Sequence, residues 1–139
     1  MKSVYISGPL RADSLYKMHL NVRLARDEAE LLWKLGFAVL CPHLNTDGMV
    51  GMLEDERRFR EGDLILMNSI DMIDMLPGWE ESEGSVIEHA RAFELKMDCV
   101  YKTLLHRPTW SLAKREKESY KRLHTNWYKE DMINYSRLT

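Results

Sequence analysis

Near its amino terminus the chain reads Val4-Tyr5-Ile6-Ser7-Gly8-Pro9, a short apolar run that ends in a turn signal. The first four residues favour extended structure, and the Gly-Pro pair that follows them interrupts it. A continuous apolar run of this length, stopped in this way, is typical of a buried strand. The sequence therefore predicts a first buried strand over residues 4–7.

The chain repeats this pattern of buried strand and helix as far as residue 105. Apolar residues recur at helical spacing from Tyr16 to Leu35, and Gly36 follows where a helix-ending glycine belongs. Further strands are predicted at 37–41, 71–76 and 99–105, further helices at 53–69 and 84–96, and a loop at 43–48. Strands that alternate with helices predict a parallel sheet with right-handed crossovers and helices on both faces.

Composition narrows the class of protein. The 139 residues suffice for one domain with a real core, and a net charge of −2 provides no basic field for nonspecific nucleic-acid binding. We therefore expect a small-molecule partner rather than nucleic acid. The amino-terminal apolar run is too short for a signal peptide and no membrane-spanning stretch follows, so we expect a cytoplasmic protein. Cys41 and Cys99 are interpreted as buried free thiols.

The composition changes after Pro108. Between His106 and Thr139 the chain has eight Lys or Arg and four Asp or Glu, a local charge of +4 against −6 for the rest. Aromatic side chains spread along such a segment are typical of a helix that packs on its own domain or on a neighbouring subunit. We therefore divide the chain into an α/β domain at 1–106 and a C-terminal helical extension at 107–139. A basic aromatic surface for nucleic acid is the alternative for the extension.

Candidate chemistry lies where the strands end, because ligands of open parallel sheets bind at the carboxyl ends of the strands. The loop from Pro77 leads into a predicted helix, where the backbone N–H groups of Gly84 and Ser85 can face an anionic or hydroxyl-rich ligand. Glu88 follows one turn into that helix, on the side that points back toward the same cleft.

Glu88 has two interpretations on physical grounds. A lone glutamate there could simply favour the positive end of the helix dipole. However, Tyr5 could hydrogen-bond a carboxylate in the cleft, and Asp63 on the preceding helix supplies a second acid. Two carboxyl groups in different environments are what nucleophilic and acid/base chemistry at an anomeric carbon requires.

Three segments, taken together, carry a family resemblance. They are residues 4–9, the run Cys41-Pro42-His43-Leu44-Asn45-Thr46, and Pro77-Gly78-Trp79-Glu80 with Ser82, Gly84 and Glu88. This set resembles the nucleoside 2-deoxyribosyltransferase-like superfamily, in particular its small phage and bacterial members, over roughly residues 2 to 105.

The resemblance implies a flavodoxin-like parallel sheet of four to five strands and a homodimer or larger homo-oligomer. It also implies cleavage of the N-glycosidic bond of a (deoxy)nucleoside or nucleoside 5′-monophosphate through a glutamyl-sugar intermediate, without a cofactor. The activity would be that of a nucleoside 2-deoxyribosyltransferase or a nucleotide N-hydrolase. Glu88 matches the nucleophile, Tyr5 the tyrosine that holds it, and Asp63 an acid near the leaving base.

Substrate-binding candidates surround these three residues. By the resemblance, Gly8 and Arg11 belong to a phosphate-side loop. The other candidates are Ser7, His43, Asn45, Trp79, Ser82 and Gly84. Trp79 has two interpretations, as a stacking partner for a base or as a cover over the core. We expect no metal site, because no further ligand stands at a suitable spacing from His43.

Two clues about the 5′ position of the substrate disagree. Ser82 stands where related nucleotide hydrolases have a phosphate-binding serine and the transferases an aspartate, which favours a 5′-phosphate. Pro9 replaces another phosphate-binding serine and has no backbone N–H to donate. The sequence leaves this choice open.

Two rival functions also stay open. Phosphoribohydrolases that release cytokinin bases and NAD-cleaving glycohydrolases use a comparable glutamate, although the spacing from Pro77 to Gly84 argues against the former. The other rival is a non-catalytic nucleotide-binding protein with the C-terminal extension as an interaction helix. A binding module has no need for Tyr5, Asp63 and Glu88 together, which argues against it.

Overall fold

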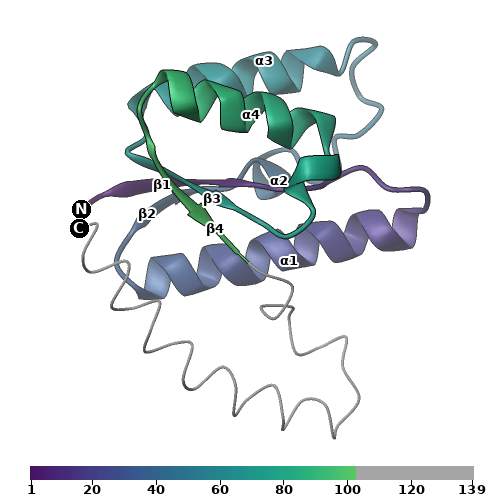
Figure 1. The fold of residues 1–139 in the computed structure, drawn as a ribbon. Helices are drawn as coiled ribbons and strands as arrows, with labels where there is room; N and C mark the ends of the chain where they lie inside the picture. The colour runs from purple at the N-terminus through teal and green to yellow at the C-terminus, as the bar shows by residue number, and fades with distance from the viewer. Residues whose placement is uncertain (103–139) are drawn as a thin grey trace, which may run out of the picture. The chain divides into compact units, whose positions relative to one another are not determined.

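The structure, a computed structural model, describes residues 1–102 and contains in this range a four-stranded, all-parallel sheet (Figure 1). Its strands are β1 (Ser3–Ser7), β2 (Ala38–Leu40), β3 (Met72–Met75) and β4 (Asp98–Tyr101). They lie in the order β2-β1-β3-β4, which is that of a flavodoxin-like sheet. The predicted fold class is confirmed for this part of the chain. The C-terminal extension at 107–139 lies outside the described residues.

Helices cover both faces of the sheet. Helix α1 (Leu15–Lys34) lies on one face, and α3 (Arg57–Leu66) and α4 (Glu83–Glu94) lie side by side on the other (Figure 1). Three short elements complete the order: α2 (Pro42–Asn45) and the 3-10 turns η1 (Met67–Ser69) and η2 (Trp79–Glu81). Among residues 1–102 no helix combines the length and apolarity needed to cross a membrane.

Local signals in the sequence explain where α1 begins and ends. The Ser14 hydroxyl accepts a hydrogen bond from the Lys17 N–H at 3.2 Å, which satisfies one of the unpaired donors of the first turn. Gly36 has a φ of +90°, a conformation that glycine adopts without the steric cost of a Cβ, and it turns the chain into β2. Helix and strand are therefore joined by a tight turn.

The central strand β1 divides the core between the two faces of the sheet. Tyr5 is fully buried and packs with Ile73, Met75 and Ala92 under α4. Because side chains alternate along a strand, its neighbour Ile6 points to the opposite face, which α1 covers. Tyr5 therefore lies on the face of the sheet that α3 and α4 cover.

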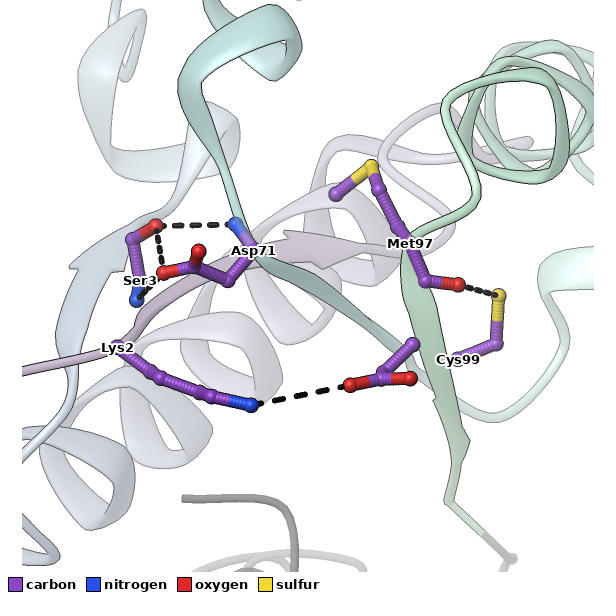
Figure 2. Close-up of polar contacts among 6 residues, drawn as sticks. Lys2, Ser3, Asp71, Met97 and Cys99 are labelled. Atoms are coloured by element: carbon purple, nitrogen blue, oxygen red, sulfur yellow. Dashed lines mark hydrogen bonds and ion pairs between the residues drawn. The ribbon is translucent and has the colours of Figure 1, made fainter.

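Polar contacts connect the amino ends of β1, β3 and β4 (Figure 2). Asp71 accepts hydrogen bonds at Oδ2 from the Ser3 N–H at 2.7 Å and the Ser3 hydroxyl at 2.9 Å. The Asp71 N–H donates in return to Ser3 Oγ at 3.0 Å. Lys2 Nζ lies 4.0 Å from Asp98 Oδ2 at the start of β4. All these contacts leave the carboxyl ends of the strands free for a site.

Three of the boundaries that differ from the sequence-based expectation have a local explanation. The expected loop at 43–48 begins as a one-turn helix, α2, because Pro42 occupies its first turn. The helix expected from Leu53 begins at Arg57, since the Glu56 carboxylate accepts the Gly51 N–H at 2.6 Å and holds the preceding segment in a turn. The third strand lacks Asp71, which is engaged with Ser3.

Gly8 provides a test of the packing at the end of β1. A Cβ at this position would lie 2.7 Å from the Leu76 Cβ. The two backbones cannot separate freely, because the Leu76 N–H donates to the Ser7 carbonyl at 2.8 Å. We expect Gly8→Ala to lower the free energy of unfolding by about 1–3 kcal/mol in urea denaturation.

Gly62→Ala is the matched control. Apart from its chain neighbours and the backbone of its own helix, nothing lies within 4 Å of a Cβ built at Gly62, which sits inside α3. Alanine should therefore raise the free energy of unfolding by up to about 1 kcal/mol through its helix propensity. Equal stability of the two variants would contradict the steric argument.

Candidate active site

A cavity of about 680 Å³ opens at the carboxyl ends of the strands. The chain leaves β1 toward β2 on one side and later returns to β3 on the other, so this edge is the switch point of the sheet. The volume falls in the range of small-molecule sites. The cavity is lined by these residues singled out from the sequence: Gly8, Pro9, Arg11, His43, Thr46, Asp63, Gly78, Ser82, Gly84, Ser85 and Glu88.

Glu88 is held by two hydroxyl groups of β1. The Tyr5 hydroxyl donates to Glu88 Oε1 at 2.9 Å, and the Ser7 hydroxyl donates to Glu88 Oε2 at 2.5 Å. Residues two apart in a strand share a face, so both hydroxyls point to the face on which α4 packs. Glu88 lines the cavity, whereas Tyr5 and Ser7 are not among the lining residues. The carboxylate is thus anchored from behind and faces open space.

Burial controls the ionisation of Glu88. Only 9% of this residue is exposed, and desolvation raises the pKa of its carboxyl to about 7, while the hydrogen bonds from Ser7 and Tyr5 oppose that rise. Nearby charges add smaller effects on this pKa, with Asp63 raising it and Arg60 lowering it. Glu88 therefore titrates close to neutral pH rather than in the usual acidic range.

Tyr5 can act only as a hydrogen-bond donor to Glu88. Burial, followed by the negative charge of Glu88, raises the pKa of the Tyr5 phenol far above its ordinary value. The phenol keeps its proton throughout the physiological range. Its bond to Glu88 is the contact that the sequence analysis expected.

Asp63 supplies a second carboxyl group in the same cavity. It is half-buried on α3, and desolvation raises its pKa to about 6. Part of the Asp63 population is therefore protonated near neutral pH, as a proton donor requires.

Helix α3 and its N-cap contribute further lining residues that were not expected from the sequence, among them Glu56, Phe59 and Arg60. Glu56, Phe59 and Arg60 lie seven, four and three positions before Asp63, so they share its face of the helix. Their spacing from Asp63 could have identified them from the sequence as further cavity residues. Arg60 Nη1 donates to Glu83 Oε1 at 3.1 Å, and Glu56 forms an ion pair with Arg11.

Three of the expected substrate-binding residues, Ser7, Asn45 and Trp79, do not line the cavity. Asn45 is exposed on α2, and its neighbour Thr46 lines the cavity instead. Trp79 lies against His89, with ring centroids 4.4 Å apart, and against Tyr101 at 6.0 Å. It also packs against the core under α4, in keeping with the interpretation as a cover over the core.

His43 holds the loop that follows β1. Its Nε2 lies 3.1 Å from the Pro9 carbonyl oxygen, and because a carbonyl can only accept, Nε2 carries the proton. Burial lowers the pKa of His43, which favours the neutral imidazole. Within residues 1–102 no group of three His, Cys, Asp or Glu side chains is placed to hold a metal ion.

Ser82 begins α4 at the edge of the cavity. Its hydroxyl oxygen accepts from the Ser85 N–H at 3.4 Å and from the Ser85 hydroxyl at 3.1 Å. This is an N-terminal helix cap, and it orients the helix that carries Glu88. Ser7, which was expected to bind substrate, bonds Glu88 instead.

These features define a class of protein, an α/β protein with a buried carboxylate at the switch point of a parallel sheet. Residues 2–101 match the family described as Domain of unknown function (DUF4406), and the chain belongs to this family. A comparison with curated proteins finds no match.

The raised pKa of Glu88 predicts how stability depends on pH. Since its pKa rises on folding from 4.5 to about 7, the folded state favours the protonated carboxyl. Its contribution to stability is fully present below pH 4.5 and is lost as the pH rises through 7. We expect Glu88→Gln, which cannot ionise, to exceed the wild type in free energy of unfolding at pH 8 by up to about 3 kcal/mol.

This advantage should disappear at pH 4, where the wild-type carboxyl is protonated. Urea denaturation at pH 4 and pH 8 measures both differences. The control is Glu80→Gln, at an exposed glutamate in η2 outside the cavity. A difference between Glu88→Gln and the wild type that stays constant with pH would refute the argument.

Proposed function

We propose that the protein cleaves the N-glycosidic bond between a sugar C1′ and a nucleobase, in a (deoxy)nucleoside or a nucleoside 5′-monophosphate. One observation carries the proposal: Glu88 faces the cavity while Tyr5 and Ser7 hold its two oxygens from behind. A carboxylate that only stabilised a helix end would have no need of two buried donors. The resemblance to the nucleoside 2-deoxyribosyltransferase-like superfamily, in which Glu88 matches the nucleophile, supports the same function.

The proposed reaction proceeds in two displacements. A Glu88 oxygen attacks C1′ and the bond from C1′ to the base nitrogen breaks, with its electron pair leaving on the base. Asp63 gives that base its proton and becomes a carboxylate. Water or a second base then attacks C1′ of the glycosyl ester and loses its proton to Asp63. The Glu88 carboxylate leaves C1′ and is regenerated.

The lining of α3 supports a site for the leaving base. Phe59 is half-buried and lies one helical turn before Asp63 on the same face. A nucleobase placed against the Phe59 ring would stack on an apolar surface with its leaving nitrogen toward the proton donor. The sugar would then lie toward Glu88, on the α4 side.

Base release tests this function. Nucleosides, nucleoside 5′-monophosphates and NAD are incubated with the full chain, with and without a free acceptor base, and the products are separated by liquid chromatography. We expect at least one substrate class to release base, and Glu88→Gln to reduce that rate by at least about 10³-fold because the nucleophile is gone. A 2-fluoro substrate of the active class should leave a sugar adduct on Glu88.

Glu80→Gln, outside the cavity, serves as the control and should keep the wild-type rate. Near-normal turnover by Glu88→Gln would overturn the proposal. Tight nucleotide binding without base release from any of these compounds would indicate a binding module.

The pH profile tests the role of Asp63. The reaction needs Glu88 ionised and Asp63 protonated. Because the pKa of Glu88, about 7, lies above that of Asp63, about 6, this form is most populated between the two values, and kcat/KM should fall below about pH 6 and above about pH 7. We expect a narrow bell with its maximum between these values. Asp63→Asn should be slower and should lose the alkaline limb. An alkaline limb that is unchanged in Asp63→Asn would rule out Asp63 as the acid.

A further inference from the structure

The Ser7 side chain is committed to Glu88. Only 1% of Ser7 is exposed, and its hydroxyl donates to Glu88 Oε2 at 2.5 Å. Its backbone is fixed by β3, because its carbonyl accepts the Leu76 N–H at 2.8 Å. Ser7 is not among the residues that line the cavity. The hydroxyl therefore serves the carboxylate rather than a bound molecule.

We infer that Ser7 is a positioning residue for Glu88, whose hydroxyl keeps the carboxylate turned toward the cavity and in its ionised form. The catalytic meaning of this inference rests on the proposed function. The effect of Ser7 on the charge of Glu88 does not, and it can be measured separately.

The geometry explains why one donor is insufficient. Tyr5 bonds Oε1 and Ser7 bonds Oε2, so a rotation of the carboxylate about its Cγ–Cδ bond breaks both contacts at once. With Tyr5 alone, only one contact would oppose that rotation. Water cannot readily replace Ser7 because both residues are buried, and an ionised oxygen that loses its donor there keeps its full desolvation cost.

The other charged and titratable groups near Glu88 do not replace this donor. Tyr5 on β1 engages the other oxygen. On α3, Asp63 carries a like charge that raises the pKa of Glu88, and Arg60, which lowers it, donates to Glu83. Removing the Ser7 hydroxyl should therefore raise the pKa of Glu88 beyond its value of about 7.

The test uses the full chain with three substitutions. Ser7→Ala removes the donor, and Ser7→Cys keeps a side chain of similar size with a weaker donor. Ser69→Ala is the matched control, because the Ser69 hydroxyl donates to the Leu66 carbonyl at 3.2 Å in the exposed turn η1. The pKa of Glu88 is read by ¹³C NMR with side-chain-labelled glutamate, the signal being assigned from its loss in Glu88→Gln.

We expect Ser7→Ala to raise the pKa of Glu88 by about one unit or more, Ser7→Cys to give a smaller rise, and Ser69→Ala to give none. If the proposed function holds, kcat/KM at pH 7 should also fall, by about fivefold for a rise of one unit, because a smaller share of Glu88 is ionised. A merely structural serine would change stability without moving the titration.

The outcomes separate this inference from the proposed function. An unchanged Glu88 titration in a folded Ser7→Ala protein overturns the role of Ser7 and leaves the proposed function intact. If Ser7→Ala does not fold, Ser7→Cys is used instead. A wild-type Glu88 titration in that variant overturns the positioning role of Ser7. A raised pKa together with no base release by the wild type supports the electrostatic role and overturns the proposed function.

Discussion

The burial of one carboxyl group, that of Glu88, shapes the rest of the site. A carboxylate removed from water is costly unless its oxygens are hydrogen-bonded, and here Tyr5 and Ser7 supply one donor to each oxygen. Both donors come from β1, so the arrangement requires α4 to pack on the face of the sheet to which these side chains point. That contact depends on the position of β1 inside the parallel sheet and on the cap of α4 at Ser82.

Two carboxyl groups at different depths give the cavity its chemical character. Glu88 is buried and hydrogen-bonded, whereas Asp63 is half-buried, and desolvation raises the pKa of both, to about 7 and about 6. Groups that titrate close to neutral pH are present both as carboxylates and as proton donors at that pH. The opposite edge of the sheet is closed by Ser3 and Asp71, so structural and candidate functional polar groups lie at opposite ends of the strands.

The sequence predicted the elements that local patterns determine. It did not predict the boundaries that are set by a single side-chain contact. The apolar run ended by Gly8 and Pro9 is a reliable sign of a strand, and β1 lies there. The start of α3 was misplaced because the contact from Glu56 to the Gly51 N–H leaves no periodic trace. Trp79 was a candidate for substrate binding because it is an aromatic residue that follows a strand. Phe59, four residues before Asp63 on the same helix face, lines the cavity instead.

The sequence by itself was enough to predict that Tyr5, Asp63 and Glu88 lie at one edge of a sheet. Alternating strands and helices imply parallel strands, and the carboxyl ends of parallel strands meet at the same edge. Which hydroxyl reaches which oxygen could be learned only from the folded chain. Ser7 turns toward Glu88 and not toward the cavity because β1 and α4, 81 positions apart at this contact, pack at a distance that no local pattern encodes.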